Sequence, residues 1–239
     1  MLLLAIDSAT PVAGVAILNE EKVLYEEFCN YRKTHSETLL PMIDRALKVC
    51  ACSLHDIDVI GITAGPGSFT GLRIGMAAVK GLSLATGKPI VAVSTLDMLA
   101  ANVLPCEDIL AVPLLDARKN EVYSAVYTFR YGTMQKVVEE KAWGIEELAL
   151  KIREKKESLF KKYVVILGDG YYPYAAYWQE VLEESLLLPP EHLMYPRSAA
   201  MGKIALAKAE RGDFADVFTL TPVYLRLSEA EYRLGRGEL

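Results

Sequence analysis

The predicted secondary structure of this chain runs through nearly the same order of elements twice. Three short apolar runs come first and predict an antiparallel meander of three strands. Apolar residues at helical spacing follow, then a fourth strand, a glycine-rich turn and a second helix. The first half therefore reads strand–strand–strand–helix–strand–helix and closes with a strand, with elements expected at residues 2–6, 12–18, 22–29, 36–50, 58–64, 72–85 and 89–93.

The second half begins the same order again, with elements expected at residues 109–115, 121–129, 134–143, 145–160, 163–167 and 175–187. Asp7 and Asp116 each end the first strand of their half. A duplicated β-β-β-α-β-α unit with an acidic residue after each first strand is the plan of the two-lobe actin-like ATPase fold (ASKHA, ribonuclease H-like). We therefore predict an α/β protein of this class; the alternative is an unrelated mixed α/β domain with a coincidental pattern.

The expected lobes divide the chain near its middle. Residues 1–105 are predicted to form the first lobe and residues 106–239 the second. The last predicted helix, residues 198–212, can pack back on either lobe, and we consider the first lobe in particular.

Composition narrows the function classes. The 239 residues carry a formal net charge of −5, whereas a protein that binds nucleic acid alone normally shows a basic stripe. The N-terminus lacks the basic region of a signal peptide, and no window approaches the roughly 18 apolar residues of a membrane span. Four cysteines match neither a disulfide framework nor a zinc site. We expect a cytoplasmic protein without a membrane partner.

The turn GPGSFTGLRIG, residues 65–75, lies between a predicted strand and a predicted helix. It fits neither phosphate-binding template, because a P-loop needs Lys after its last glycine and a dinucleotide fingerprint needs Gly where this chain has Thr70. Gly71, Gly75 and Ala78 instead give the helix one smooth face that allows another backbone to approach closely. That backbone belongs either to the same chain or to a second protein.

Several segments together resemble one family. They are AIDSAT at the start, HSETLLP, DVIGITAGPGSFTGLRIG, KGLSLATGKPIVAVSTLDMLA, LLDARKNEVYSAVY and the late PVYLR. In this order they closely resemble the TsaB family, over nearly the whole chain and most strongly up to residue 127.

The resemblance implies a role in making threonylcarbamoyladenosine in tRNA, next to the anticodon. It implies a non-catalytic scaffold subunit that pairs with its catalytic paralogue TsaD, helps recruit the ATPase TsaE, homodimerises when alone and meets tRNA only through the complex. Both kinds of pairing are expected to use the two helices of the first lobe. The candidate interface residues are His35, Leu39, Met42, Ile43, Leu47, Phe69, Gly71, Leu72, Arg73, Gly75, Met76 and Val79. On this basis a bulky residue at position 75 should block pairing without unfolding the chain.

No catalytic constellation is predicted. The resemblance places Thr95 and Leu99 where the catalytic relatives carry two metal-binding histidines, and leucine cannot ligate a metal. We therefore expect no metal site and no enzymatic activity. Two alternatives stay open: a small-molecule kinase or ATPase of the same superfamily, which would need tight nucleotide binding, and a glycoprotease-like peptidase, which would need a metal.

Four residues are candidates for a nucleotide site. In active members of the superfamily, acidic residues at these strand ends face the phosphates across the cleft, so Asp7, Ser8, Asp116 and Arg118 are the candidates. An aspartate before a Ser/Thr turn also commonly satisfies local backbone N–H groups, and this second interpretation is favoured. We expect no cofactor held tightly by the chain alone, with ATP or ADP shared at a partner interface as the remaining option.

Overall fold

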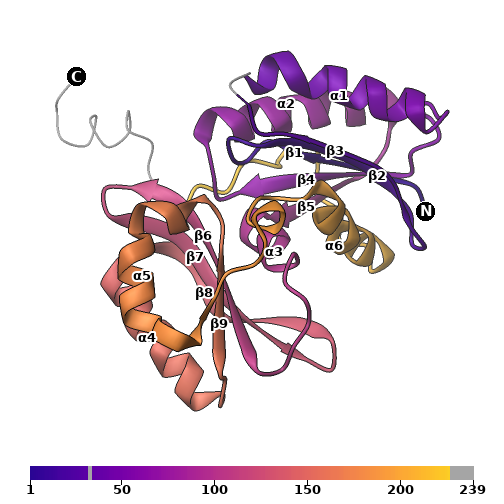
Figure 1. Ribbon diagram of the computed structural model, residues 1–239. Helices are drawn as coiled ribbons and strands as arrows, with labels where there is room; N and C mark the ends of the chain where they lie inside the picture. The colour runs from indigo at the N-terminus through magenta and orange to yellow at the C-terminus, as the bar shows by residue number, and fades with distance from the viewer. Residues whose placement is uncertain (32–33, 227–239) are drawn as a thin grey trace, which may run out of the picture.

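The computed structural model describes residues 1–31 and 34–226, which form two lobes around two five-stranded sheets (Figure 1). The first sheet has the order β3-β2-β1-β4-β5. In it β1 pairs antiparallel with β2 and parallel with β4. Its elements are β1 (Leu3–Asp7), β2 (Ala13–Leu18), β3 (Val23–Cys29), α1 (His35–Val49), β4 (Val59–Gly65), α2 (Phe69–Thr86), β5 (Ile90–Ser94) and α3 (Thr95–Ala100).

The first sheet is covered on both faces, which explains why β1 is buried along its whole length. Because side chains alternate along a strand, Leu4 and Ile6 meet one apolar core together with residues of α1 and α2. Leu3 and Ala5 meet the other core, which α3 and α6 (Ser198–Glu210) complete. Figure 1 shows α1 and α2 side by side on the outer face of this sheet.

The second sheet has the order β10-β9-β6-β7-β8. Figure 1 shows α4 and α5 together along its outer side. Its large apolar core includes Leu148, Ile152 and Trp178 from these helices. The elements are β6 (Ile109–Arg118), β7 (Glu121–Arg130), β8 (Thr133–Gly144), α4 (Ile145–Ser158), β9 (Tyr163–Leu167), α5 (Ala175–Leu182), β10 (Leu186–Leu187) and 3-10 turns at Asp169–Tyr174, Glu183–Ser185 and Glu191–Leu193. The predicted duplicated order and the two-lobe α/β fold are confirmed.

Helix α6 packs on the first lobe, the placement considered for the helix at residues 198–212, although a simple division at residue 106 assigns it to the second. Met201 and Ala205 of α6 lie close over Gly61 of β4, where no side chain stands in their way. The following segment stays on the same lobe, since the N–H of Ala215 donates to the carbonyl of Ile90. Burial of the apolar face of α6 against the first sheet therefore overrides the simple division in sequence.

Candidate partner-binding face and interlobe cavity

The glycine-rich turn packs against the turn between β1 and β2. Gly65 has φ +120, and a Cβ at Gly67 would overlap the carbonyl of Ala9, so both positions require glycine. The N–H of Ser68 donates to the carbonyl of Ala9 at 2.7 Å, and the Ser68 hydroxyl accepts from the N–H of Gly71 at 3.3 Å. The turn therefore uses its backbone donors within the chain, as its mismatch with the phosphate-binding templates suggests.

The smooth face of α2 receives this chain and no second protein. A Cβ on Gly71 would overlap the carbonyl of Ser8, and a Cβ on Gly75 would overlap the Ser8 hydroxyl. That hydroxyl donates to the carbonyl of Gly71 at 2.9 Å in a buried setting. The expectation that these two glycines make room for a partner helix is wrong, because the β1–β2 turn fills the space.

The Asp7 side chain forms hydrogen bonds that hold the turn between β1 and β2. Its carboxylate accepts from the Thr63 hydroxyl at 2.6 Å and from the N–H of Ala9 at 3.0 Å. The residue is only 1 % exposed, and this burial raises the pKa of the carboxyl group. Asp7 and Ser8 thus hold the first lobe together, in the local role that the turn interpretation gives them.

A cavity of about 400 Å³ lies between the lobes. The first lobe contributes the β1–β2 turn and the start of α2, and the second lobe contributes the end of β6 and the turn after β9. Its lining includes Thr10, Ser68, Phe69, Asp116, Arg118, Lys119, Tyr123, Asp169 and Arg226. Of the four nucleotide candidates, Asp116 and Arg118 line this cavity, whereas Asp7 and Ser8 are buried beside it.

Two carboxylates stand together on the second-lobe wall of the cavity. Asp116 accepts from the N–H of Arg118 at 2.8 Å and lies 3.6 Å from its guanidinium, while Asp169 accepts from the N–H of Asp116 at 3.3 Å. Burial raises the pKa of Asp169, and the charge of Asp116 adds to the effect. Asp169 was not among the predicted site residues. Its place between two glycines, directly after a predicted strand, is a signal that could have identified it.

The raised pKa of Asp169 predicts a measurable pH dependence. An aspartate with a higher pKa in the folded chain binds more protons when folded, so the free energy of unfolding falls as pH rises above the ordinary value of 3.8. We expect Asp169→Asn, which keeps the acceptor oxygen, to make this fall shallower and to be the more stable protein at neutral pH. Urea unfolding from about pH 4 to pH 7 measures it, with Asp7 unchanged in both proteins. Parallel curves for the two proteins would contradict the assignment.

The segment PVYLR ties the two lobes beside the cavity. The N–H of Val223 donates to the carbonyl of Ala64 in the first lobe at 2.7 Å. The ring of Tyr224 stacks on Phe69 with a centroid distance of 4.3 Å. Arg226 reaches the second lobe, where it donates to the carbonyl of Ala117 at 3.0 Å and pairs with Glu121 at 3.1 Å.

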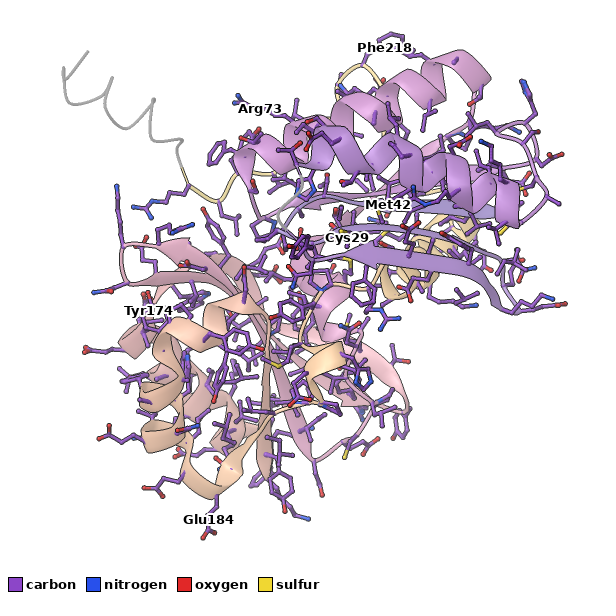
Figure 2. All side chains as sticks on the ribbon, turned by 45° about the horizontal axis from the view of Figure 1, so that its top comes forward. Cys29, Met42, Arg73, Tyr174, Glu184 and Phe218 are labelled. Carbon is purple, nitrogen blue, oxygen red and sulfur yellow. The ribbon has the colours of Figure 1, made fainter. Side chains whose placement is uncertain are left out.

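Most of the candidate interface residues face the core. In Figure 2 the side chain of Met42 lies between α1 and the sheet, whereas Arg73 projects outward from α2. Arg73 is exposed, and Phe69 and Leu47 are half-buried. The buried candidates, which cannot contact a partner in this conformation, are Leu39, Met42, Ile43, Gly71, Leu72, Gly75, Met76 and Val79. The apolar periodicity that selected them marks the inner faces of the helices.

His35, at the start of α1, is also turned inward. Its Nε2 lies 2.8 Å from the carbonyl of Thr10, so this nitrogen carries the proton and donates. Its Nδ1 is buried without a partner among the described residues. The helix start itself is fixed by Thr34 as N-cap and by Glu37, whose carboxylate accepts from the Thr34 N–H at 3.1 Å.

The outward faces of α1 and α2 both carry exposed apolar residues, here together called the outer helical face. It consists of Leu40 on α1 and of Ala77, Gly81, Leu84 and Ala85 on α2. Leu40 is 56 % exposed and Leu84 is 59 % exposed. The α2 members lie at helical spacing, so small residues again make a smooth strip, this time toward solvent.

The positions that the resemblance aligns with metal-binding histidines lie in α3. Thr95 and Leu99 are both fully buried, and the Thr95 hydroxyl has no partner in the described part of the chain. Residues 1–31 and 34–226 contain no group of three or more His, Cys, Asp or Glu arranged to hold a metal ion. Nor does any helix in those ranges have the length and apolarity that a bilayer crossing requires.

Comparison with known proteins shows which proteins this chain resembles. Residues 26–234 match the family model described as "TsaD: tRNA N6-adenosine threonylcarbamoyltransferase". A Bacillus subtilis protein named tRNA threonylcarbamoyladenosine biosynthesis protein TsaB is 31% identical, covering 97% of this chain and 96% of its own. The protein of that name from Escherichia coli is 32% identical, covering 98% of each chain.

Solved structures agree with this placement. YeaZ from Pseudomonas aeruginosa superposes with a TM-score of 0.77 at 27% identity, covering 93% of this chain and 99% of that one. A ROK hexokinase from Thermus thermophilus superposes with a TM-score of 0.52 at 12% identity, covering 89% of this chain and all of that one. The second similarity concerns the fold alone and agrees with the two-lobe actin-like plan.

Proposed function

This chain belongs to the TsaB family and takes part in tRNA threonylcarbamoyladenosine biosynthesis, and we propose that it does so as a non-catalytic scaffold subunit that pairs with TsaD. The observation that supports this role most is the outer helical face. Leu40 and Leu84 leave more than half of their side chains in water on adjacent helices, and Ala77 and Gly81 leave room for a helix to approach. Covering this area with a second helical pair removes apolar surface from water.

The non-catalytic part of the proposal is supported by how the chain uses its acidic residues. A kinase or ATPase of this fold needs the carboxylate after the first strand for metal and phosphates, but here Asp7 accepts two hydrogen bonds from its own lobe. A peptidase of the kind considered above needs metal ligands, and Thr95 and Leu99 stand buried at the aligned positions. We therefore favour the scaffold over both alternatives.

The same proposal covers the remaining partners. Homodimerisation in the absence of TsaD uses the outer helical face, since one apolar surface serves both pairings. The ATPase TsaE and tRNA join the assembled pair. A nucleotide shared with a partner would meet Asp116 and Arg118 in the interlobe cavity, the two nucleotide candidates that line it.

Light scattering after size exclusion tests the pairing. We expect the chain alone to run as a dimer and an equimolar mixture with TsaD from the same source to run as a complex containing both proteins. A titration with Mg-ATP on the same samples should show binding only in the mixture. A chain that stays monomeric and ignores TsaD would refute the scaffold, and tight Mg-ATP binding by the chain alone would favour the kinase or ATPase.

A further inference from the structure

Two bulky aromatic residues in the second lobe are almost fully exposed and have left-handed backbone conformations. Phe160, after α4, has φ +52 and is 89 % exposed, and Tyr131, in the turn between β7 and β8, has φ +50 and is 85 % exposed. Glycine or asparagine normally occupies such positions, because a side chain with φ in this range costs about 1 kcal/mol or more. Neither ring is buried, so packing in the core does not offset the conformational free energy that these positions cost.

The two rings stand on neighbouring turns at one end of the second sheet. Glu107 joins them, since its carboxylate accepts from the N–H of Tyr131 at 3.0 Å and its carbonyl accepts from the ammonium of Lys161. The strands that lead to these turns are β9 and β7, with β6 between them. Two strand spacings place the turns about 10 Å apart, at the end of β6 opposite the interlobe cavity. Figure 1 shows both turns at the lower end of the second lobe.

Basic residues are frequent in the sequence next to the two rings. The stretch KIREKKESLFKK, residues 151–162, holds six basic and two acidic residues in a chain whose formal net charge is −5. In the described ranges, Arg130, Arg153 and Lys156 form no ion pair. The carbonyl of Lys156 accepts from the N–H of Lys161 at 2.8 Å, which closes the turn that carries Phe160. The Arg130 guanidinium lies 5.3 Å from the centroid of the Tyr131 ring.

We propose that this end of the second lobe binds RNA: Phe160 and Tyr131 stack on unpaired bases while Arg130, Arg153 and Lys156 neutralise the adjoining phosphates. Base–aromatic stacking needs flat, exposed rings, and cations beside them hold the backbone of the strand. Because the chain serves a tRNA modification, the RNA is an unpaired loop of tRNA; this inference rests on the proposed function. It assigns direct RNA contacts to a subunit that is otherwise expected to meet tRNA only through its partners.

The mixture of charges favours RNA over an anionic membrane surface. Glu107, Asp108 and Glu157 lie among the basic residues. An anionic bilayer is a uniform negative plane and would repel these carboxylates. Nucleotides alternate phosphates with base edges that can donate to a carboxylate, so a strand of RNA tolerates the same arrangement.

The test replaces both rings with asparagine. Asparagine tolerates the left-handed conformation, so Phe160→Asn with Tyr131→Asn should fold at least as well as the parent. The matched control is Phe218→Asn, which removes a ring that is 79 % exposed on the first lobe. Fluorescence anisotropy with an unmodified tRNA transcript is measured on the chain mixed with TsaD and on the chain alone. We expect the double variant to bind at least tenfold more weakly and the control to bind like the parent.

A charge variant gives a second measurement. Arg153→Gln with Lys156→Gln should lower the slope of log affinity against log salt by about 1.4, since each lost phosphate contact on a single strand contributes about 0.7. Unchanged RNA binding in both variants, or loss of binding to anionic vesicles of phosphatidylserine but not to tRNA, would overturn the inference. Complex formation with TsaD is followed in the same samples, so failure to pair refutes the proposed function separately.

Discussion

We expect Gly75→Ala to lower the free energy of unfolding by about 1–3 kcal/mol, the usual cost of adding atoms to a packed interior. The new Cβ would overlap the Ser8 hydroxyl and lie 3.3 Å from Ile62. The hydroxyl cannot simply rotate away at no cost, because it is buried and donates to the carbonyl of Gly71. Moving it leaves the buried Ser8 hydroxyl without its acceptor, which costs about 1–3 kcal/mol on its own.

Gly81→Ala is the matched control on the same helix. A Cβ at Gly81 meets nothing within 4 Å, and its backbone φ is not in the left-handed range. Alanine in an exposed helix interior is more favourable than glycine, so we expect a gain of about 0.5–1 kcal/mol. Urea unfolding followed by circular dichroism compares the two variants with the parent. Equal effects of the two substitutions would show that the β1–β2 turn does not occupy the Gly75 side of α2.

The plan of the fold could be predicted from the sequence because it depends on periodicity alone. The apolar run of β1 and the helical spacing in α1 are local patterns, and the acidic residue after each first strand marks the repeat. The same periodicity selected interface candidates most of which lie in the core. It selects the apolar stripe of a helix, which for Leu39 and Val79 is the stripe that covers the sheet.

What the sequence did not predict depends on contacts between distant segments. The residue that approaches Gly71 and Gly75 is Ser8, more than sixty positions earlier, and nothing local to α2 indicates it. Asp169 enters the cavity through parallel pairing of β9 with β6. The place of α6 depends on distant contacts in the same way: the sequence left this helix able to pack on either lobe, and it packs on the first sheet.

The second prediction with a large expected effect concerns the outer helical face. Ala77 is exposed near the middle of α2, between Arg73 and Gly81 on the same strip. We expect Ala77→Glu to weaken pairing with TsaD at least a hundredfold, because pairing would bury a carboxylate without a partner, which costs several kcal/mol. The folded chain itself should be unaffected, since glutamate is a good helix former at an exposed site.

Ala207→Glu on α6 is the matched control, because it adds the same charge at an exposed alanine on the opposite side of the first sheet. Analytical size exclusion and titration calorimetry with TsaD compare both variants with the parent at equal salt. A carboxylate at either site changes the net charge equally, so long-range repulsion cannot separate them. If Ala77→Glu loses pairing while Ala207→Glu keeps it, the contact is local to α2. If the reverse holds, TsaD binds the α6 side of the first sheet. The exposed Leu40 and Leu84 would then have to bind a different partner.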